Sequence, residues 1–155
     1  KHLRRLFLKA VVLAPAHYVL YIGEQNRRLY RSLNVPAQQL RFTPYAVDNR
    51  RFRQQAAAER PVAGQTKAEL GLAGRQVILF AGKLIAKKRP MDLLRAYHRL
   101  LAGYDGLALV FIGDGELRPM LEAYVAEHRL PNVRITGFVN QTDMARYYAI
   151  GDVFV

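Results

Sequence analysis

The sequence predicts an α/β fold in which helices flank a parallel sheet. Short apolar runs alternate with stretches of helical periodicity, which is the pattern of β-α-β units. Two runs, 77–81 and 107–112, are apolar at every position, as expected for parallel strands that are covered on both faces. The stretch 90–102 instead places apolar residues at helical spacing and is expected to bury one stripe.

Residues 1–64 are expected to form short elements. In order, these are a basic amphipathic helix at 1–14, a strand at 18–22, a helix at 24–33, a strand at 40–43, an extended connector at 44–52 and a loop or ragged helix at 53–64. Asn34 suits the left-handed position after helix 24–33, and Pro36 prevents the helix from continuing.

The pattern is clearer from residue 76 onward. The expected elements are strands at 77–81, 107–112, 133–136 and 152–155, and helices at 90–102, 116–128 and 140–149. Asn140 is the expected N-cap of the last helix, with Asp143 in its first turn. The predicted buried stripe of helix 90–102 consists of Leu93, Ala96, Tyr97, Leu100 and Leu101.

The charge of the chain is strongly positive and unevenly placed. Lys and Arg number 24 against 12 Asp and Glu, which gives a net charge of +12. Residues 1–60 alone hold twelve basic and three acidic side chains. This asymmetry predicts an anionic partner, either nucleic acid or a layer of lipid headgroups. A solvated basic face without a partner is the alternative.

Several classes of site are excluded by composition. The chain has no cysteine, so disulfides, thiolate metal sites and cysteine nucleophiles are ruled out. Its single serine, Ser32, lacks the neighbouring glycines of a nucleophile elbow. The four histidines are scattered without metal-ligand spacing, so no metal site is expected.

A glycine followed by basic residues joins the strand 77–81 to the helix 90–102. Ligands of open parallel sheets bind at the carboxyl ends of the strands, and glycine lets a ligand approach the backbone. Gly82, Lys83, Lys87, Lys88 and Arg89 therefore form a candidate diphosphate site just before a helix N-terminus. The alternative is an exposed loop that is basic without binding anything.

Two further strand-end loops carry glycine. Gly113-Asp114-Gly115 resembles the start of a dinucleotide fingerprint, but Arg118 occupies the third glycine position, which weakens a nicotinamide-dependent dehydrogenase as a candidate. Without a ligand, this segment is a tight turn at the sheet edge. Gly137, Phe138 and Val139 follow the next strand, where their backbone could contact a base or simply turn. Gly113, Gly137, Phe138 and Val139 are thus candidates for nucleotide-binding loops.

Read in order, these segments resemble one family. The resemblance rests on Thr43–Phe52, on Leu79–Leu84 followed by Lys88, on Val110–Leu117, on Val133–Val139, and on Ala145–Tyr148 with Gly151–Val155. In this order and spacing they resemble the nucleotide-sugar-binding domain of the retaining GT-B glycosyltransferases of family 4 type, the glycosyl transferases group 1.

The resemblance implies a Rossmann-like sheet within a two-domain GT-B architecture. Residues 1–43 would be the tail of the N-terminal, acceptor-binding domain. Residues 44–155 would be the hinge and the first half of the C-terminal, donor-binding domain. The strand at 152–155 lacks the loop and helix that should follow a buried parallel strand, so we expect the sequence to be cut there. The fragment itself is expected to be inactive, with its catalytic residues outside the chain.

The resemblance also implies an activity. A sugar would pass from a UDP or GDP sugar to a glycan or lipid-linked acceptor with retention of configuration, without metal or cofactor, in cell-envelope or polysaccharide synthesis. Lys83, Lys88 and Gly82 would hold the donor diphosphate. Lys83 stands where the family usually has arginine, and Ala46 replaces the hinge glycine. The expected location is the cytoplasm, with the inner face of the cytoplasmic membrane as an additional site.

The basic charge and the first helix each allow two interpretations. A basic nucleic-acid-binding α/β module is the alternative function, but the Tyr and Phe residues fall mainly at core-type positions instead of forming a stacking platform, so we expect no nucleic acid. The apolar stripe of residues 1–14 suits either an anionic membrane surface or packing on the N-terminal domain.

Overall fold

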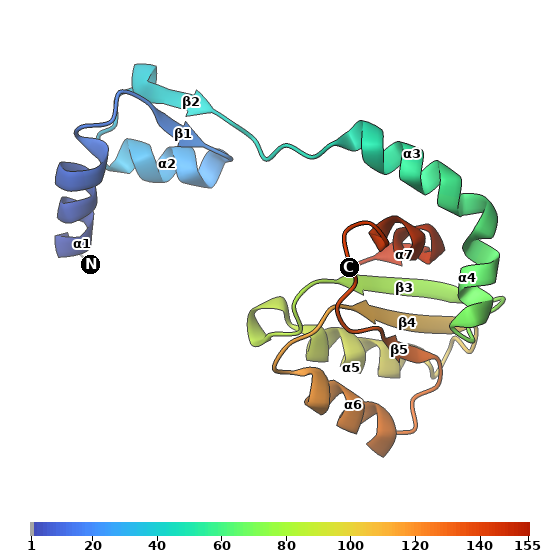
Figure 1. Cartoon of the computed structure of the whole chain (residues 1–155). Helices are drawn as coiled ribbons and strands as arrows, with labels where there is room; N and C mark the ends of the chain where they lie inside the picture. The colour runs from blue at the N-terminus through green and yellow to red at the C-terminus, as the bar shows by residue number, and fades with distance from the viewer. Residues whose placement is uncertain (1) are drawn as a thin grey trace. The chain divides into compact units, whose positions relative to one another are not determined.

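A computed structural model describes residues 2–155, and the chain forms two compact units (Figure 1). The units are Lys1–Asp48 and Asn49–Val155. The division falls a few residues after the boundary that the sequence predicts at residue 44. The assignment of the two units to two different GT-B domains stays a prediction.

The first unit is a small α/β assembly. Its elements are α1 (His2–Phe7), the π-helix η1 (Leu8–Leu13), β1 (Val19–Tyr21), α2 (Glu24–Ser32), the 3-10 helix η2 (Ala37–Gln39) and β2 (Leu40–Phe42). The two strands pair in parallel, as the sequence predicts. Asn34 has a φ of 61°, which confirms its left-handed position after α2. The buried side chains are Leu13, Val19, Leu33, Val35 and Leu40.

The second unit is built on a four-stranded parallel sheet. In chain order its elements are α3 (Asn49–Glu59), η3 (Arg60–Val62), α4 (Ala63–Glu69), β3 (Gln76–Ala81), η4 (Ala86–Lys88), α5 (Pro90–Leu100), β4 (Leu107–Ile112), α6 (Arg118–Glu127), β5 (Val133–Ile135), α7 (Met144–Ile150) and β6 (Val153–Phe154). The strand order is β5-β4-β3-β6, so the last strand lies beside the first.

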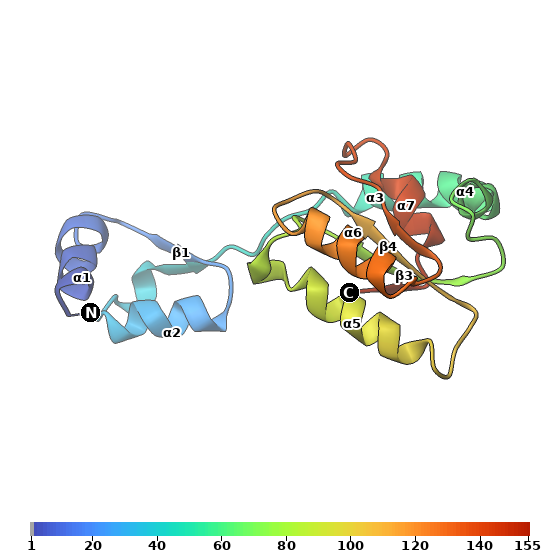
Figure 2. The ribbon, with the colours of Figure 1, turned by 90° about the horizontal axis from the view of Figure 1, so that it is seen from below.

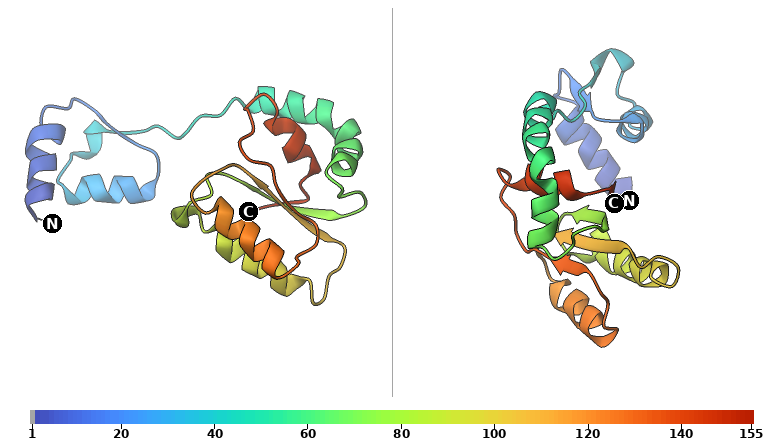
Figure 3. Two further views of the ribbon diagram at one scale, coloured as in Figure 1. Left: turned by 60° about the horizontal axis from the view of Figure 1, so that its bottom comes forward. Right: turned by 90° about the vertical axis from the view of Figure 1, so that its right-hand side faces the viewer.

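Helices cover both faces of this sheet. The helices α5 and α6 lie on one face, and α3, α4 and α7 lie on the other (Figures 2 and 3). Successive residues of the central strands therefore enter two different cores. For example, Phe111 packs with Leu94 of α5 and Leu121 of α6, whereas Val110 packs in the core that α7 covers. This arrangement explains why both central strands are apolar throughout.

The segment before the sheet differs from the prediction at its start. The extended connector ends at Asp48 and not at residue 52, and of the two alternatives for 53–64 the ragged helix is the one observed, because α3, η3 and α4 make residues 49–69 almost entirely helical. The segment is rich in Ala, Gln and Arg, which favour helix without marking an apolar stripe. Tertiary contacts fix it, because Arg146 of α7 donates hydrogen bonds to Thr66 and to Glu69 of α4.

Two details of the later helices also differ from the prediction. On α5 the buried residues are Pro90, Met91, Leu94 and Tyr97, while Ala96 and Leu100 are exposed. The helix is rotated so that its buried face centres on Leu94, with Leu93 and Leu101 at the margin of the core. Asn140 does not cap α7, because the helix begins at Met144 and the N-cap position, Asp143, makes no side-chain capping bond.

Candidate functional site

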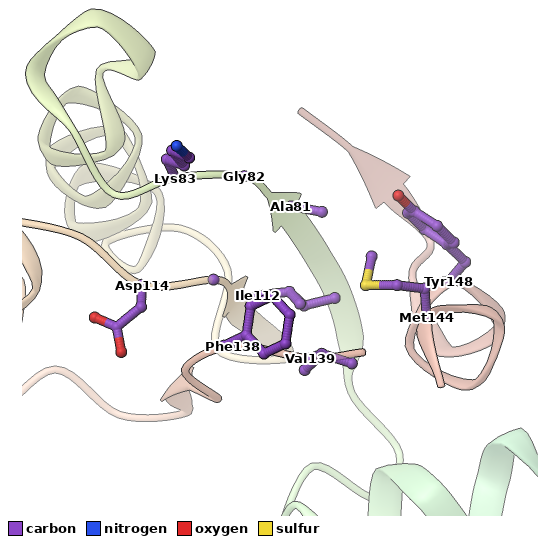
Figure 4. A pocket seen from close by; sticks show the side chains of 10 residues that line it. Ala81, Gly82, Lys83, Ile112, Asp114, Phe138, Val139, Met144 and Tyr148 are labelled. Carbon is purple, nitrogen blue, oxygen red and sulfur yellow. The ribbon is translucent and has the colours of Figure 1, made fainter. Parts of the chain in front are cut away.

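A cavity of about 430 Å³ lies where β3 and β4 end (Figure 4). Five residues that the sequence singled out line it, namely Gly82, Lys83, Gly113, Phe138 and Val139. The other lining residues are Ala81, Ile112, Asp114, Met144 and Tyr148. The strand-end loops after β3, β4 and β5 therefore meet at one edge of the sheet, as expected for a parallel α/β sheet.

Four of the predicted residues, Lys87, Lys88, Arg89 and Gly137, do not line the cavity. Lys88 is exposed at the end of η4, in the same loop as Lys83. Gly137 is bonded to the cavity residue Gly113. The backbone N–H of Gly113 donates to the Gly137 carbonyl at 2.8 Å. Gly137 thus joins the loops after β4 and β5, and its φ of 76° is left-handed.

The loop after β3 is anchored through its backbone and leaves the Lys83 side chain exposed. Gly82 N–H donates to the Ile112 carbonyl at 2.9 Å, and Leu84 N–H donates to the Asp114 carbonyl at 2.9 Å. Lys83 lies between these two anchors and is exposed. A Cβ on Gly82 would meet only the Phe80 ring, at 3.7 Å, so packing does not require glycine here.

The loop after β4 is different because packing does require its glycines. Gly113 has a φ of 134°, and a Cβ there would lie 2.0 Å from the Gly82 carbonyl oxygen. A Cβ on Gly115 would lie 2.5 Å from the Leu84 carbonyl oxygen. The two loops cross at van der Waals distance, which accounts for Gly113 and Gly115 without a dinucleotide.

The acidic residue of the cavity is already paired. Asp114 accepts hydrogen bonds from the Gly115 N–H at 2.8 Å and from Arg118 at 2.9 Å. The Gly115 N–H, followed by the Arg118 guanidinium, lowers the pKa of Asp114 below its ordinary value. Arg118 also contacts Glu122 at 2.8 Å, so this one guanidinium is shared by two carboxylates.

The cations of the loop after β3 are not neutralised in this way. Among residues 2–155, neither Lys83, Lys87 nor Lys88 makes an ion pair or side-chain hydrogen bond, whereas Arg89 pairs with Asp92 in the first turn of α5. Three positive charges therefore stand close to a helix N-terminus, which is an unfavourable place for cations unless an anion binds.

Helix α7 supplies cavity residues that the sequence reasoning missed. Met144 and Tyr148 lie four residues apart and face the end of β3 in Figure 4. Tyr148 is held against Phe154 of β6, with ring centroids 5.7 Å apart. The helical spacing of Met144 and Tyr148 is visible in the sequence. Only the pairing of β6 with β3 brings their helix, α7, to the cavity.

A second, more polar cavity of about 470 Å³ lies beyond Phe138 and Val139. Its other lining residues are Glu59, Thr136, Asn140, Thr142, Asp143, Arg146 and Tyr147. Phe138 borders both cavities, and 83% of its surface is exposed. Within the part of the chain that the structure describes, no group of three or more His, Cys, Asp or Glu side chains could hold a metal ion.

A family model described as glycosyl transferases group 1 matches residues 64–155, more than half of the chain. The chain belongs to this family. The match begins within α4 and includes all four strands of the larger sheet, so it contains the cavity of 430 Å³. The resemblance to the glycosyl transferases group 1 is thereby confirmed, and the retaining, family 4 type stays a prediction.

Relatives among characterised proteins cover most of the chain. A GDP-mannose-dependent alpha-(1-6)-phosphatidylinositol monomannoside mannosyltransferase of Mycobacterium tuberculosis is 28% identical over 144 residues, or 88% of this chain and 34% of that protein. Alpha-monoglucosyldiacylglycerol synthase of Acholeplasma laidlawii is 28% identical over 91 residues, or 57% of this chain and 23% of that protein. The chain spans about a third or less of the length of these relatives.

Solved structures share the fold. Anabaena HepE in complex with UDP and glucose superposes with a TM-score of 0.70 at 15% identity, covering 97% of this chain and 41% of that chain. The C-terminal domain of LpcC from Francisella tularensis, a glycosyl transferase group 1 family protein, gives a TM-score of 0.52 at 19% identity, covering 59% and 51%. These neighbours confirm the predicted α/β class, with parallel sheets flanked by helices as in GT-B glycosyltransferases.

Proposed function

We propose that the protein transfers a sugar from a nucleotide diphosphate sugar to an acceptor, and that this chain supplies the binding edge for the donor diphosphate. The observation that carries the proposal is the set of unpaired lysines beside the cavity, above all Lys83. Gly82 lets a phosphate approach the backbone, and Lys83 and Lys88 offer positive charge to it. The GDP-mannose dependence of one relative and the UDP complex of one neighbour support a nucleotide donor.

The chemical role of these groups follows from charge. Cleavage of the bond between the sugar and the diphosphate leaves negative charge on the diphosphate oxygens. Fixed cations placed where that charge develops stabilise the transition state more than the ground state. Asp114 adds little repulsion, because Arg118 pairs with it. Since lysines can supply this stabilisation, the proposed reaction uses no metal.

The test is calorimetry of UDP and GDP binding to the intact protein. Lys83→Ala and Lys88→Ala each remove a charge-assisted contact of about 1.5–3 kcal/mol, so we expect the affinity to fall roughly 10- to 150-fold. Lys83→Arg should retain most of the affinity. Arg99→Ala is the control, because it removes an exposed charge from the opposite end of α5, and we expect less than about a twofold change. Unaltered binding by both Lys83→Ala and Lys88→Ala would remove the assignment.

Retention of configuration is part of the same proposal, on the strength of the family resemblance. The anomeric signal of the first product, observed by NMR before mutarotation, distinguishes the two stereochemical outcomes. A product with the donor's configuration supports the proposal, and the opposite configuration contradicts it.

The proposal also names an acceptor and a location. The acceptor is a glycan or is linked to a lipid, and the reaction serves cell-envelope or polysaccharide synthesis at the inner face of the cytoplasmic membrane. Two relatives are named for lipid substrates, a phosphatidylinositol mannoside and a diacylglycerol. Leu3, Leu6 and Phe7 of the basic first helix are exposed, which suits an anionic interface. Within residues 2–155, no helix has both the length and the apolar character needed to span a membrane.

Co-sedimentation of the intact protein with anionic and neutral vesicles tests the membrane part. We expect binding to anionic vesicles that weakens when Leu6→Asp or Phe7→Asp is introduced. Equal binding to both kinds of vesicle would contradict a role for charge, and binding that the two substitutions leave unchanged would assign the contact to another surface.

A further inference from the structure

Two histidines and a tyrosine form a cluster on α5 and α6 that the proposed donor site does not use. His98 lies on α5, Tyr124 on α6, and His128 at the C-cap of α6. The two helices lie side by side on one face of the sheet (Figure 2). Because each helix ends where the chain turns into the next strand, this cluster lies at the sheet edge opposite the 430 Å³ cavity.

The three rings are in mutual contact. The ring centroids of His98 and His128 are 4.9 Å apart, those of Tyr124 and His128 are 4.2 Å apart, and those of His98 and Tyr124 are 5.9 Å apart. His98 and Tyr124 are half-buried, while His128 is exposed. Solvent therefore reaches the pair of imidazoles from the His128 side.

Tyr124 fixes the ring of His98. The Tyr124 hydroxyl lies 3.0 Å from Nδ1 of His98, so this nitrogen is engaged within the protein. If Nδ1 carries the proton and donates it to the hydroxyl, Nε2 is the nitrogen with a free lone pair. Metal-binding histidines typically have this arrangement, in which the second ring nitrogen is held by a hydrogen bond.

The distance between the two ring centroids is also compatible with a shared ion. With metal–nitrogen bonds of about 2.0–2.1 Å, two imidazoles on one tetrahedral ion have ring centroids roughly 5 Å apart. The observed separation is 4.9 Å. Imidazole nitrogen suits zinc, copper and nickel among the divalent ions.

We propose that His98 and His128 form a two-histidine site for a divalent transition-metal ion, positioned by Tyr124 and completed by water. The described residues offer no third His, Cys, Asp or Glu at this place, so the affinity is modest and solvent supplies the remaining ligands. A bound ion would link the C-terminal ends of α5 and α6, and it would stabilise the folded state by mass action. The site plays no part in the proposed sugar transfer.

The test is calorimetric titration of the intact, untagged protein with ZnCl₂ and with NiCl₂. We expect one ion per chain at this site, reversal by a chelator, and a thermal midpoint that rises with metal concentration. His98→Ala and His128→Ala should each lower the affinity at least about tenfold. Tyr124→Phe keeps both ligands but removes the hydrogen bond, so a smaller loss is expected. His17→Ala, an exposed histidine of the first unit, is the control and should bind as the unmodified protein does.

The exposed His128 keeps the test decisive if the half-buried His98 cannot be replaced without unfolding. Failure of Zn²⁺ and Ni²⁺ to bind, or equal affinity of His128→Ala and the unmodified protein, would overturn the proposal. Neither result bears on the donor site, because UDP and GDP binding is measured separately and His128→Ala should leave it unchanged.

Discussion

The loops after β3 and β4 lie at the same edge of the sheet, and both combine glycine with charged residues. In the loop after β4, Gly113 and Gly115 are needed because the chain passes close to the Gly82 and Leu84 carbonyls. Its Asp114 carboxylate pairs with Arg118, which also pairs with Glu122. In the loop after β3, Gly82 has no such steric reason, and its lysines have no partners among residues 2–155.

This difference shows how a loop that binds a ligand can be distinguished from a loop that only supports the fold. Folding alone explains a glycine at a position where a Cβ would clash, such as Gly113. It also explains a charged side chain that has a partner, such as Asp114. Gly82, where a Cβ would make only an ordinary contact, and the unpaired lysines beside a helix N-terminus are not accounted for in this way. Such cations carry a cost in the absence of an anion. This contrast supports the proposal that the loop after β3 binds the donor diphosphate and that the loop after β4 supports it.

The largest expected effect comes from Gly113→Ala. The new Cβ would lie 2.0 Å from the Gly82 oxygen, and the residue would also keep a φ of 134°, which an L-residue rarely adopts. We expect the free energy of unfolding to fall by about 3 kcal/mol or more. Urea denaturation measures it. Gly106→Ala, at the other end of β4, has nothing within 4 Å of its Cβ and should change little. Similar values for the two variants would contradict the steric argument.

A medium effect, on binding instead of stability, is expected from Gly82→Ala. The Cβ would reach only the Phe80 ring at 3.7 Å, so the free energy of unfolding should change by less than about 1 kcal/mol. The methyl group would still occupy the space next to Lys83, and we expect the affinity for UDP or GDP to fall about tenfold. Denaturation and calorimetry on the same preparation separate the two quantities. A stable variant with unaltered affinity would remove the distinction between the loops.

The smallest effect is expected from Asp114→Asn. Because the pKa of Asp114 is lowered, its carboxylate stabilises the folded state above the ordinary pKa of 3.8, and this contribution is lost as the pH falls through the lowered value. The variant should unfold at a slightly lower temperature at neutral pH, and the difference from the unmodified protein should shrink as the pH falls below about 4 and the Asp114 carboxylate is protonated. Thermal midpoints across this range measure it. A large loss at neutral pH would mean that Asp114 does more than pair with Arg118.

The central sheet was the part of the fold that the sequence predicted best. β3 and β4 are apolar on both faces, so a continuous run marked each of them almost to the residue. The helices α3 and α4 carry no comparable stripe, and α4 is held instead by hydrogen bonds from Arg146 of α7. On α5, helical periodicity alone did not decide which side of the helix is buried. Packing against the sheet buries Leu94 and leaves Ala96 and Leu100 exposed.

The candidate site was predicted in part for a similar reason. Gly82, Lys83, Gly113, Phe138 and Val139 follow strands, and the carboxyl ends of parallel strands meet at one edge. Met144 and Tyr148 reach the cavity from a helix whose position depends on the strand order, and no local pattern reveals that order. The pairing of Asp114 with Arg118 depends equally on the path of the loop.

The position of β6 has a consequence for the order in which the second unit assembles. β6 pairs with β3, its register joining Ile78 to Val153, whereas β4 and β5 pair with strands that lie much closer in sequence. The Asp152 carboxylate secures this late contact, because it accepts hydrogen bonds from the Val77 N–H at 2.7 Å and from Lys67 at 2.9 Å. Closing the longer loop costs more chain entropy, so β3, β4 and β5 are expected to pair first. During synthesis, the edge of β3 that receives β6 would stay open until residues 152–154 leave the ribosome, and it is the edge at which a nascent chain is most exposed to wrong partners.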